Sequence, residues 1–458
     1  MILDRHDYVL AESVPTAEAL IVPNLLRNRH YSIAKLRPLL SPLDVADRSF
    51  LRAIKHRHAN PVYRLRPISR AEGRRIRELD LSGIFAFKTF DRVGQRPGTL
   101  ADLIGGVDFF DNGASGLERH FQEVLDGTNG TTLLTLSGLG ETLREENTEP
   151  AVDGRPLQLT IDRGLQRDVQ HDLDQQLSSA VAASAVLLRP AGAVTALVDL
   201  GKGAHDGRVS AVDRAFEPGS AFDPITIAAA IDEGFVTSTE SFLLPDIGSD
   251  GTLGDSVAGA GRSLSAARIL AEPNDLGTIL IGLRLGAKRF DRWVGTFGFG
   301  ASTGLEMPGE HRGEVPELVP SAPAVMGVAP IGRGESVTLL QLARAFATFA
   351  NDGREPVPYL IARFGHHIHP APAARQVVSE RTADIVLRSL ASGIGGEVPA
   401  IEMSTGTFSP SNSTAAFVGF VPPEDPRFVL ALYVHSLSGE ALSSLRSVFR
   451  KISVSLAE

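Results

Sequence analysis

Residues 214–226 read Arg-Ala-Phe-Glu-Pro-Gly-Ser-Ala-Phe-Asp-Pro-Ile-Thr, and the rest of the chain is organised around this stretch. A Pro218-Gly219 turn leads to Ser220, and the apolar run that follows predicts a helix with Gly234 as its C-terminal stop. A serine at the start of a helix has an exposed hydroxyl, and the helix amides lie close to any oxyanion that forms there. Ser220 is therefore the candidate nucleophile.

The composition limits the kind of protein. A chain of 458 residues with 43% hydrophobic content predicts at least two folded domains. The net charge of −9 argues against nucleic acid or an anionic membrane surface as the main partner. The absence of cysteine excludes disulfides and thiolate metal sites. His366, His367 and His369 read as a solvated loop, because no carboxylate with ligand spacing lies beside them. We therefore expect neither a metal nor a cofactor.

The sequence also bears on cellular location. No stretch approaches the roughly 18 apolar residues needed to span a bilayer. Residues 1–12 lack the pattern of a signal peptide. As written, the sequence predicts no anchor or export signal, and a segment upstream of Met1 would have to supply one.

The stretch around Ser220 is similar to the nucleophile motif of penicillin-binding proteins, in which Pro-Gly precedes Ser-x-x-Lys. This resemblance covers nearly the whole chain. It implies an α+β fold, in which a β-lactamase/transpeptidase-like domain has an antiparallel sheet flanked by helices. Further motifs follow Ser220 in the order found in class B members of that family: Phe297-Gly-Phe-Gly300, Thr303-Gly304, Pro308-Gly-Glu310, the run from Gly332 to Gln341, and the closing strands at 417–422 and 428–434.

The first 155 residues resemble the pedestal that precedes the transpeptidase domain in class B members. Three segments carry this likeness: Asp4-Arg5 with residues 9–13, residues 66–76, and Gly116-Leu-Glu118. Ser69 and Glu72 also predict a helix capping box. A polar segment at 148–156, broken by Pro and Gly, predicts the boundary. We therefore expect a pedestal (dimerisation-like) domain at 1–155 and a transpeptidase-like domain at 156–458.

The start of the second domain has its own local signals. Leu157-Gln-Leu-Thr-Ile-Asp162 resembles the opening of the family's transpeptidase domain. A helix of about 20 residues should follow it. Strand-like runs at 185–188 and 193–198, separated by Arg189-Pro-Ala-Gly192, predict a hairpin.

The resemblance implies where catalytic groups would lie, and the first of them is altered. In the family, a lysine one helical turn after the serine accepts its proton. Here Ser220 is kept, but the lysine position holds Asp223. Aspartate is a poor base for serine, because its reference pKa is ~3.9. Ser220 and Asp223 read instead as a helix capping box.

The second and third motifs are altered in the same direction. The family's Ser-x-Asn loop falls at Glu272 and Asn274, so its serine is lost. Its Lys-Thr-Gly strand falls at Ser404, Thr405 and Gly406, so its lysine is lost. The three substitutions change the formal charge by −2, −1 and −1, or −4 in all. Peptidoglycan stems and β-lactams present a carboxylate there, so their binding should weaken as well.

These motifs predict a penicillin-binding-protein homologue of peptidoglycan synthesis or cell division that is a catalytically inactive pseudo-transpeptidase with a binding or scaffolding role. The resemblance implies partners such as a SEDS-type glycosyltransferase, and a location on the extracytoplasmic face of the bacterial inner membrane. One alternative is an active D,D-transpeptidase or carboxypeptidase, acylated at Ser220 with a non-standard general base. Another is a glycosidase that uses Asp223 and Glu272 as a carboxylate pair.

Overall fold

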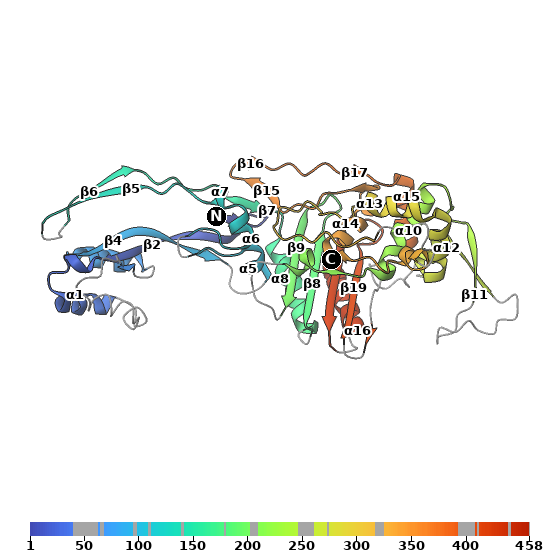
Figure 1. The fold of residues 1–458 in the computed structure, drawn as a ribbon, viewed down its shortest axis with the longest axis horizontal. Coiled ribbons are helices and arrows are strands. Elements are labelled where there is room, and N and C mark those ends of the chain that lie inside the picture. The colour runs from blue at the N-terminus through green and yellow to red at the C-terminus, as the bar shows by residue number, and fades with distance from the viewer. Residues whose placement is uncertain are drawn as a thin grey trace.

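The computed structural model describes residues 1–39, 63–64, 68–94, 99–108, 111–138, 142–177, 180–201, 209–245, 261–272, 274–316, 325–392, 408–409, 412–437 and 441–457. The molecule is elongated (Figure 1). Helix α1 (Arg29–Leu36) lies near one end and strand β11 (Ser241–Pro245) near the other, with the N-terminus between them.

A seven-stranded sheet connects the two halves of the sequence. Its order is β16-β15-β7-β1-β2-β3, and β4 also pairs with β2. Strand β1 pairs in parallel with β7 and antiparallel to β2, so the first residues are held beside the start of the predicted second domain. The strands are β1 (Ile2–Leu3), β2 (Val9–Ile21), β3 (Tyr63–Arg64), β4 (Ile84–Gly94), β7 (Leu157–Leu159), β15 (Ile361–Phe364) and β16 (His367–Ile368).

The far part of the β2–β4 pair carries a small separate core, which we call the distal head (residues 15–39, 63–64 and 68–90). Helix α4 (Arg70–Glu78) can pack closely on β2 because Gly73 has no Cβ, which would overlap the Cβ of Ala17. The predicted capping box is confirmed: Ser69 Oγ accepts from the Glu72 amide, and Glu72 Oε2 accepts from the Ser69 amide. Short 3-10 turns at Pro23–Leu25 and Arg37–Leu39 flank α1. The core residues include Ala19, Ile21, Leu36, Ile76, Leu81 and Ile84.

The near part of the N-terminal region joins the main core of the molecule. Leu103, Ile104 and Leu117 are buried in the same cluster as the second half of the chain. Beside them a two-stranded hairpin, β5–β6, extends along the molecule (Figure 1). The elements are α5 (Thr99–Ile104), α6 (Gly116–His120), α7 (Gln122–Leu125), β5 (Thr131–Leu136) and β6 (Thr142–Glu149).

The second half is built on a five-stranded antiparallel sheet of order β18-β19-β20-β8-β9, as the predicted fold class requires. The predicted hairpin is confirmed as β8 and β9, and the helix before it is α8, somewhat shorter than expected. Helices α8 and α16 cover one face, and α14 lies on the other. The bounds are α8 (Arg163–Leu177), β8 (Ala182–Leu188), β9 (Val194–Gly201), α14 (Leu339–Ala350), β18 (Phe408–Ser409), β19 (Asn412–Val421), β20 (Phe428–Ser436) and α16 (Ala441–Ala457).

A helical layer beyond α14 surrounds the buried helix α10 (Asp223–Asp232). It ends where predicted, with Gly234 in the left-handed region and its amide bonded to Ile231 O. Around it are α9 (Ser210–Asp213), α11 (Ala266–Ala271), α12 (Asp275–Leu285), α13 (Ala287–Thr296) and α15 (Glu380–Ala391). Three short pairs complete this part: β10 (Ala215–Phe216) with β13 (Val337–Thr338), β11 with β12 (Gly261–Ser265), and β14 (Arg354–Glu355) with β17 (Arg375–Gln376).

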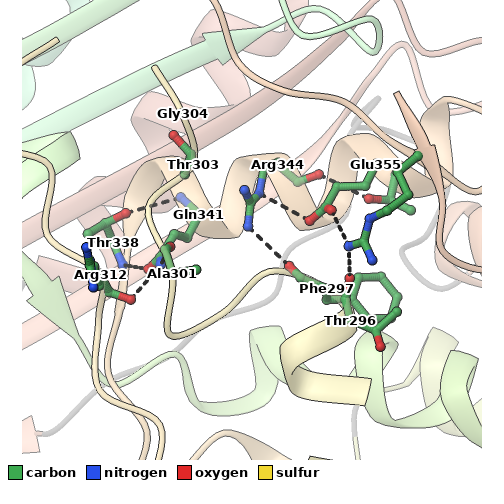
Figure 2. A network of polar contacts seen from close by, with 12 residues as sticks. Thr296, Phe297, Ala301, Thr303, Gly304, Arg312, Thr338, Gln341, Arg344 and Glu355 are labelled. Carbon is green, nitrogen blue, oxygen red and sulfur yellow. Dashed lines mark hydrogen bonds and ion pairs between the residues drawn. The ribbon is translucent and has the colours of Figure 1, made fainter. Parts of the chain in front are cut away.

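Helix α14 fixes the loops that carry most of the family-like motifs (Figure 2). Thr338 and Gln341 form a capping box at its start, and Gln341 Nε2 donates to Ala301 O and Arg312 O, each at 2.8 Å. One turn later, Arg344 donates to Phe297 O, and its Nε lies 3.3 Å from Glu355 Oε1. These motifs therefore act first as a frame, because their polar groups bond to backbone atoms and to one another.

Candidate functional site

Ser220 lies on a single 3-10 turn, Gly219–Phe222, that leads directly into α10. This turn is held against the loop before β13, because the Gly219 amide donates to Gly332 O at 3.1 Å. Gly332 has a left-handed φ of 66°, and a Cβ there would overlap Gly219 O. The glycines of the two motifs thus allow the serine turn and the Gly332 loop to approach closely.

The side chain that meets Ser220 is one that the sequence did not single out. Ser220 Oγ donates to Asp275 Oδ1 at 3.2 Å. Asp275 is the first residue of α12, and its other oxygen lies 3.9 Å from Arg333 Nη2. Arg333 is the second residue of the Gly332 loop, so the three side chains come from three separate segments. Asp275 directly follows the predicted Asn274, and this position is the sequence feature that could have identified it as a site residue.

Asp223, at the family's lysine position, points into the core. It is fully buried, and neither carboxylate oxygen has a hydrogen-bond partner among the described residues. Burial raises the pKa of Asp223 well above its usual value, and the nearby Asp275 raises it further. The hydroxyl of Thr278 on α12 acts in the opposite direction, although no hydrogen bond joins the two side chains. The neutral acid is therefore the favoured form.

The predicted capping box at Ser220 and Asp223 is wrong. No side-chain cap is present at the start of the 3-10 turn or of α10. Ser220 donates its hydrogen bond to Asp275 instead, and neither oxygen of Asp223 accepts one from the Ser220 amide.

The side chains of the second motif contact groups other than Ser220. Glu272 forms ion pairs with Arg262, at 2.5 Å, and with Arg268. Asn274 caps α12 by accepting from the Gly277 amide at 2.9 Å. The carboxylate that raises the pKa of Asp223 is Asp275, whereas Glu272, the second member of the glycosidase alternative, pairs with the two arginines. Asn274 has a sufficient structural role, and Glu272 belongs to a surface ion cluster.

Ser404, Thr405 and Gly406, the third predicted motif, lie outside the described residues. The strand after them, β18, pairs antiparallel with β19 through Phe408↔Ser413 and Ser409↔Asn412. The described residues hold no cluster of three His, Asp or Glu side chains suited to a metal. His366 and His367 are exposed on the β15–β16 hairpin, and His369 lies 3.7 Å from Glu306.

A second buried carboxyl group lies beside the serine turn. Glu335, in the loop after Gly332, is only 3% exposed, and its Oε2 has no hydrogen-bond partner among the described residues. Burial raises its pKa to about 8; its own amide opposes this change, and Glu217 at the start of the serine motif adds to it. The serine turn is therefore flanked by two buried acidic groups, Asp223 and Glu335.

Comparison with known proteins gives a consistent result. The model of the penicillin binding protein transpeptidase domain matches residues 183–453, and the model of the penicillin-binding protein dimerisation domain matches residues 1–159. The penicillin-binding protein PbpB of Mycolicibacterium smegmatis is 30% identical over 416 residues, which cover 78% of this chain and 63% of that protein. The stage V sporulation protein D of Bacillus subtilis is 23% identical over 495 residues, covering 96% and 74%.

Solved structures share the fold. The penicillin binding protein 3 of Mycobacterium tuberculosis, complexed with aztreonam, matches 99% of this chain and 94% of that chain, with a TM-score of 0.69 and 21% identity. A peptidoglycan synthetase of Bifidobacterium adolescentis matches 98% and 93%, with a TM-score of 0.74 and 22% identity. The chain spans 63% and 57% of the lengths of the two mycobacterial PbpB proteins. None of its described helices is long and apolar enough to cross a membrane.

Proposed function

This chain belongs to the penicillin-binding protein transpeptidase family, and we propose that it is a member without D,D-transpeptidase activity. Its role would be to bind or scaffold other components of peptidoglycan synthesis or cell division. The names of its relatives support this setting, since they include the peptidoglycan D,D-transpeptidase FtsI of Buchnera aphidicola and the sporulation protein of Bacillus subtilis. The division into a pedestal at 1–155 and a transpeptidase-like domain at 156–458 is part of the proposal.

The buried Asp223 carries this proposal. A serine nucleophile needs a base within hydrogen-bond reach. Asp223 occupies the position from which the family's lysine would act, but its oxygens are inaccessible and its neutral form is favoured. Arg333, which lies 3.9 Å from Asp275, cannot serve as a base, because a guanidinium stays protonated. The assigned positions Ser220, Glu272, Asn274, Ser404, Thr405 and Gly406 would then belong to a remnant site.

The partners follow from the same reasoning. We propose a protein of cell-wall synthesis or division, such as a SEDS-type glycosyltransferase, as the main partner, and no nucleic acid. Binding of a stem peptide or a β-lactam would be weak. Asp275 places a carboxylate beside Ser220, and it would repel the carboxylate of a ligand that approaches Ser220.

One observation favours the alternative of an active serine enzyme. The hydrogen bond from Ser220 Oγ to Asp275 Oδ1 aligns a carboxylate that could accept the serine proton. The other oxygen of Asp275 lies 3.9 Å from Arg333 Nη2, so this alternative would place a cation next to the base. In this alternative Asp275, and not Asp223, replaces the family's lysine as the base.

Acylation by a fluorescent penicillin separates the two functions. The purified chain is compared with Ser220→Ala and Asp275→Asn, beside a penicillin-binding protein that retains Ser-x-x-Lys. We expect no label on any form of this chain, and no mass increase of the intact protein. Labelling that disappears in Ser220→Ala overturns the proposal. If it also disappears in Asp275→Asn, Asp275 is the base.

A further inference from the structure

The charge of this chain is unevenly distributed. Residues 15–90 hold 15 Lys and Arg against 6 Asp and Glu, whereas the remaining residues hold 30 against 48. The net charge of −9 is therefore the sum of a basic segment and a much more acidic remainder. The whole-chain charge argues against an anionic surface as a partner, but this argument does not apply to the distal head, which is basic.

Three of these basic residues lie on one outer surface of the distal head. Gly73 and Ile76 on α4 are buried against the sheet, so Arg70, Arg74 and Arg75 lie on the exposed side. None of these three arginines forms an ion pair with another described residue. Their charges are therefore not neutralised by carboxylates within the described chain.

Helix stability does not account for Arg70 and Arg74, whereas Arg75, in the last turn of α4, is favoured by the helix dipole. Arg70 occupies the first position of α4, where the positive end of the helix dipole disfavours a cation. Arg70 and Arg74 are also four residues apart, and like charges at that spacing repel each other. Glu72, the acidic residue between them, is already bonded to Ser69 in the capping box. Contact with an anionic partner explains this placement better.

Helix α1 packs on the same small core as α4, through Leu36, and carries exposed cations and an aromatic ring. Arg27, just before α1, and Lys35 within it are exposed, and Lys35 Nζ lies 5.6 Å from the centre of the Tyr31 ring. Tyr31 is itself 54% exposed. An exposed tyrosine beside flexible cations is typical of a protein surface that lies at a lipid–water interface. The distal head also forms one end of the elongated molecule, where it can meet a flat surface (Figure 1).

We propose that the distal head is a peripheral contact surface for anionic phospholipid headgroups, formed by Arg70, Arg74 and Arg75 of α4 together with Arg27, Tyr31 and Lys35. Clusters of four to eight basic residues bind anionic lipid surfaces, and each Lys or Arg near the surface contributes a similar binding free energy. A specific site for a phosphorylated or acidic peptide would need arginines fixed in a defined geometry. Arg70, Arg74 and Arg75 form no such supporting contact with another described residue, which favours a diffuse lipid surface. This surface is independent of the Ser220 site.

Co-sedimentation of the full chain with vesicles tests the proposal. Vesicles of phosphatidylglycerol mixed with phosphatidylcholine are compared with vesicles of phosphatidylcholine alone. The triple variant Arg70→Gln/Arg74→Gln/Arg75→Gln should bind the anionic vesicles on the order of 100-fold more weakly than the unaltered chain at low salt. Binding of the unaltered chain should also fall as salt rises, because screening shortens the range of these charges.

A matched control removes the same charge elsewhere. Arg167, Arg381 and Arg450 are exposed and lie outside the distal head, so their triple replacement by Gln should leave vesicle binding unchanged. Circular dichroism checks that both triple variants are folded. Equal binding to neutral vesicles, or equal loss in both triple variants, overturns the proposal. A head-dependent complex with polyglutamate or RNA, without binding to anionic vesicles, would instead assign the surface to a macromolecular partner.

Discussion

Replacing Glu335 by glutamine should remove a pH-dependent cost to stability beside the Ser220 turn. The pKa of Glu335 is raised from 4.5 to about 8 in the folded chain, so the folded state binds one more proton than the unfolded state between these pH values. Its contribution to the free energy of unfolding is fully present below pH 4.5 and is lost as the pH rises to about 8. The loss approaches about 1.4 kcal/mol per pH unit and amounts to about 3 kcal/mol between pH 5 and pH 8.

The assay uses the single tryptophan of the chain. Trp293 on α13 is buried in the same core as the β13 region that follows Glu335, so its fluorescence reports unfolding of this part. Urea unfolding of Glu335→Gln and the unaltered chain is measured at several pH values. The difference in unfolding free energy should grow by about 3 kcal/mol in favour of the variant from pH 5 to pH 8. A difference that does not change with pH would refute the assigned burial of the charge.

Three further predictions rest on other parts of the structure. Asp223→Asn should likewise flatten the pH dependence of unfolding monitored by Trp293. The raised pKa of Asp223 means that the folded state loses stability when this group ionises, and asparagine cannot ionise. An unchanged pH profile would contradict the burial of Asp223. Glu355→Gln should lower the free energy of urea unfolding by about 3 kcal/mol, because it leaves the buried charge of Arg344 without its carboxylate partner. The control Asp384→Asn removes the carboxylate of an exposed pair with Arg388 and should cost less than about 1 kcal/mol. Gly73→Ala should expose the distal head to limited proteolysis without shifting the Trp293 transition, since the new Cβ would overlap Ala17; a shift of both would show that the head and the main core unfold together.

The local elements of this chain could be predicted because short-range physics determines them. The Ser69–Glu72 capping box, the stop at Gly234 and the β8–β9 hairpin each depend on groups a few residues apart. The ordered motifs from Phe297 to Gln341 also identified the fold. The structure shows why these motifs occur together. Gln341 and Arg344, one turn apart on α14, donate hydrogen bonds to the loops that contain the earlier motifs (Figure 2).

The composition of the site could not be predicted in the same way. A spacing of three residues places two side chains on one face only within a continuous helix. Ser220 instead lies on a 3-10 turn, and Asp223 begins the next helix. Packing of α10 against α12 then buries Asp223, and the arginines of β12 and α11 hold Glu272. The partner of Ser220 is consequently Asp275, which is 55 residues away in the sequence.

The sequence by itself determined the family, the order of the motifs and the loss of the lysine after Ser220. Only the tertiary structure decided that Asp223 is a buried acid, that Asp275 meets Ser220, and that arginines gather on the outer side of the distal head. The physical reason is that turns, caps and residue types are properties of neighbouring residues. Burial, pKa and surface charge depend on which distant segments pack together.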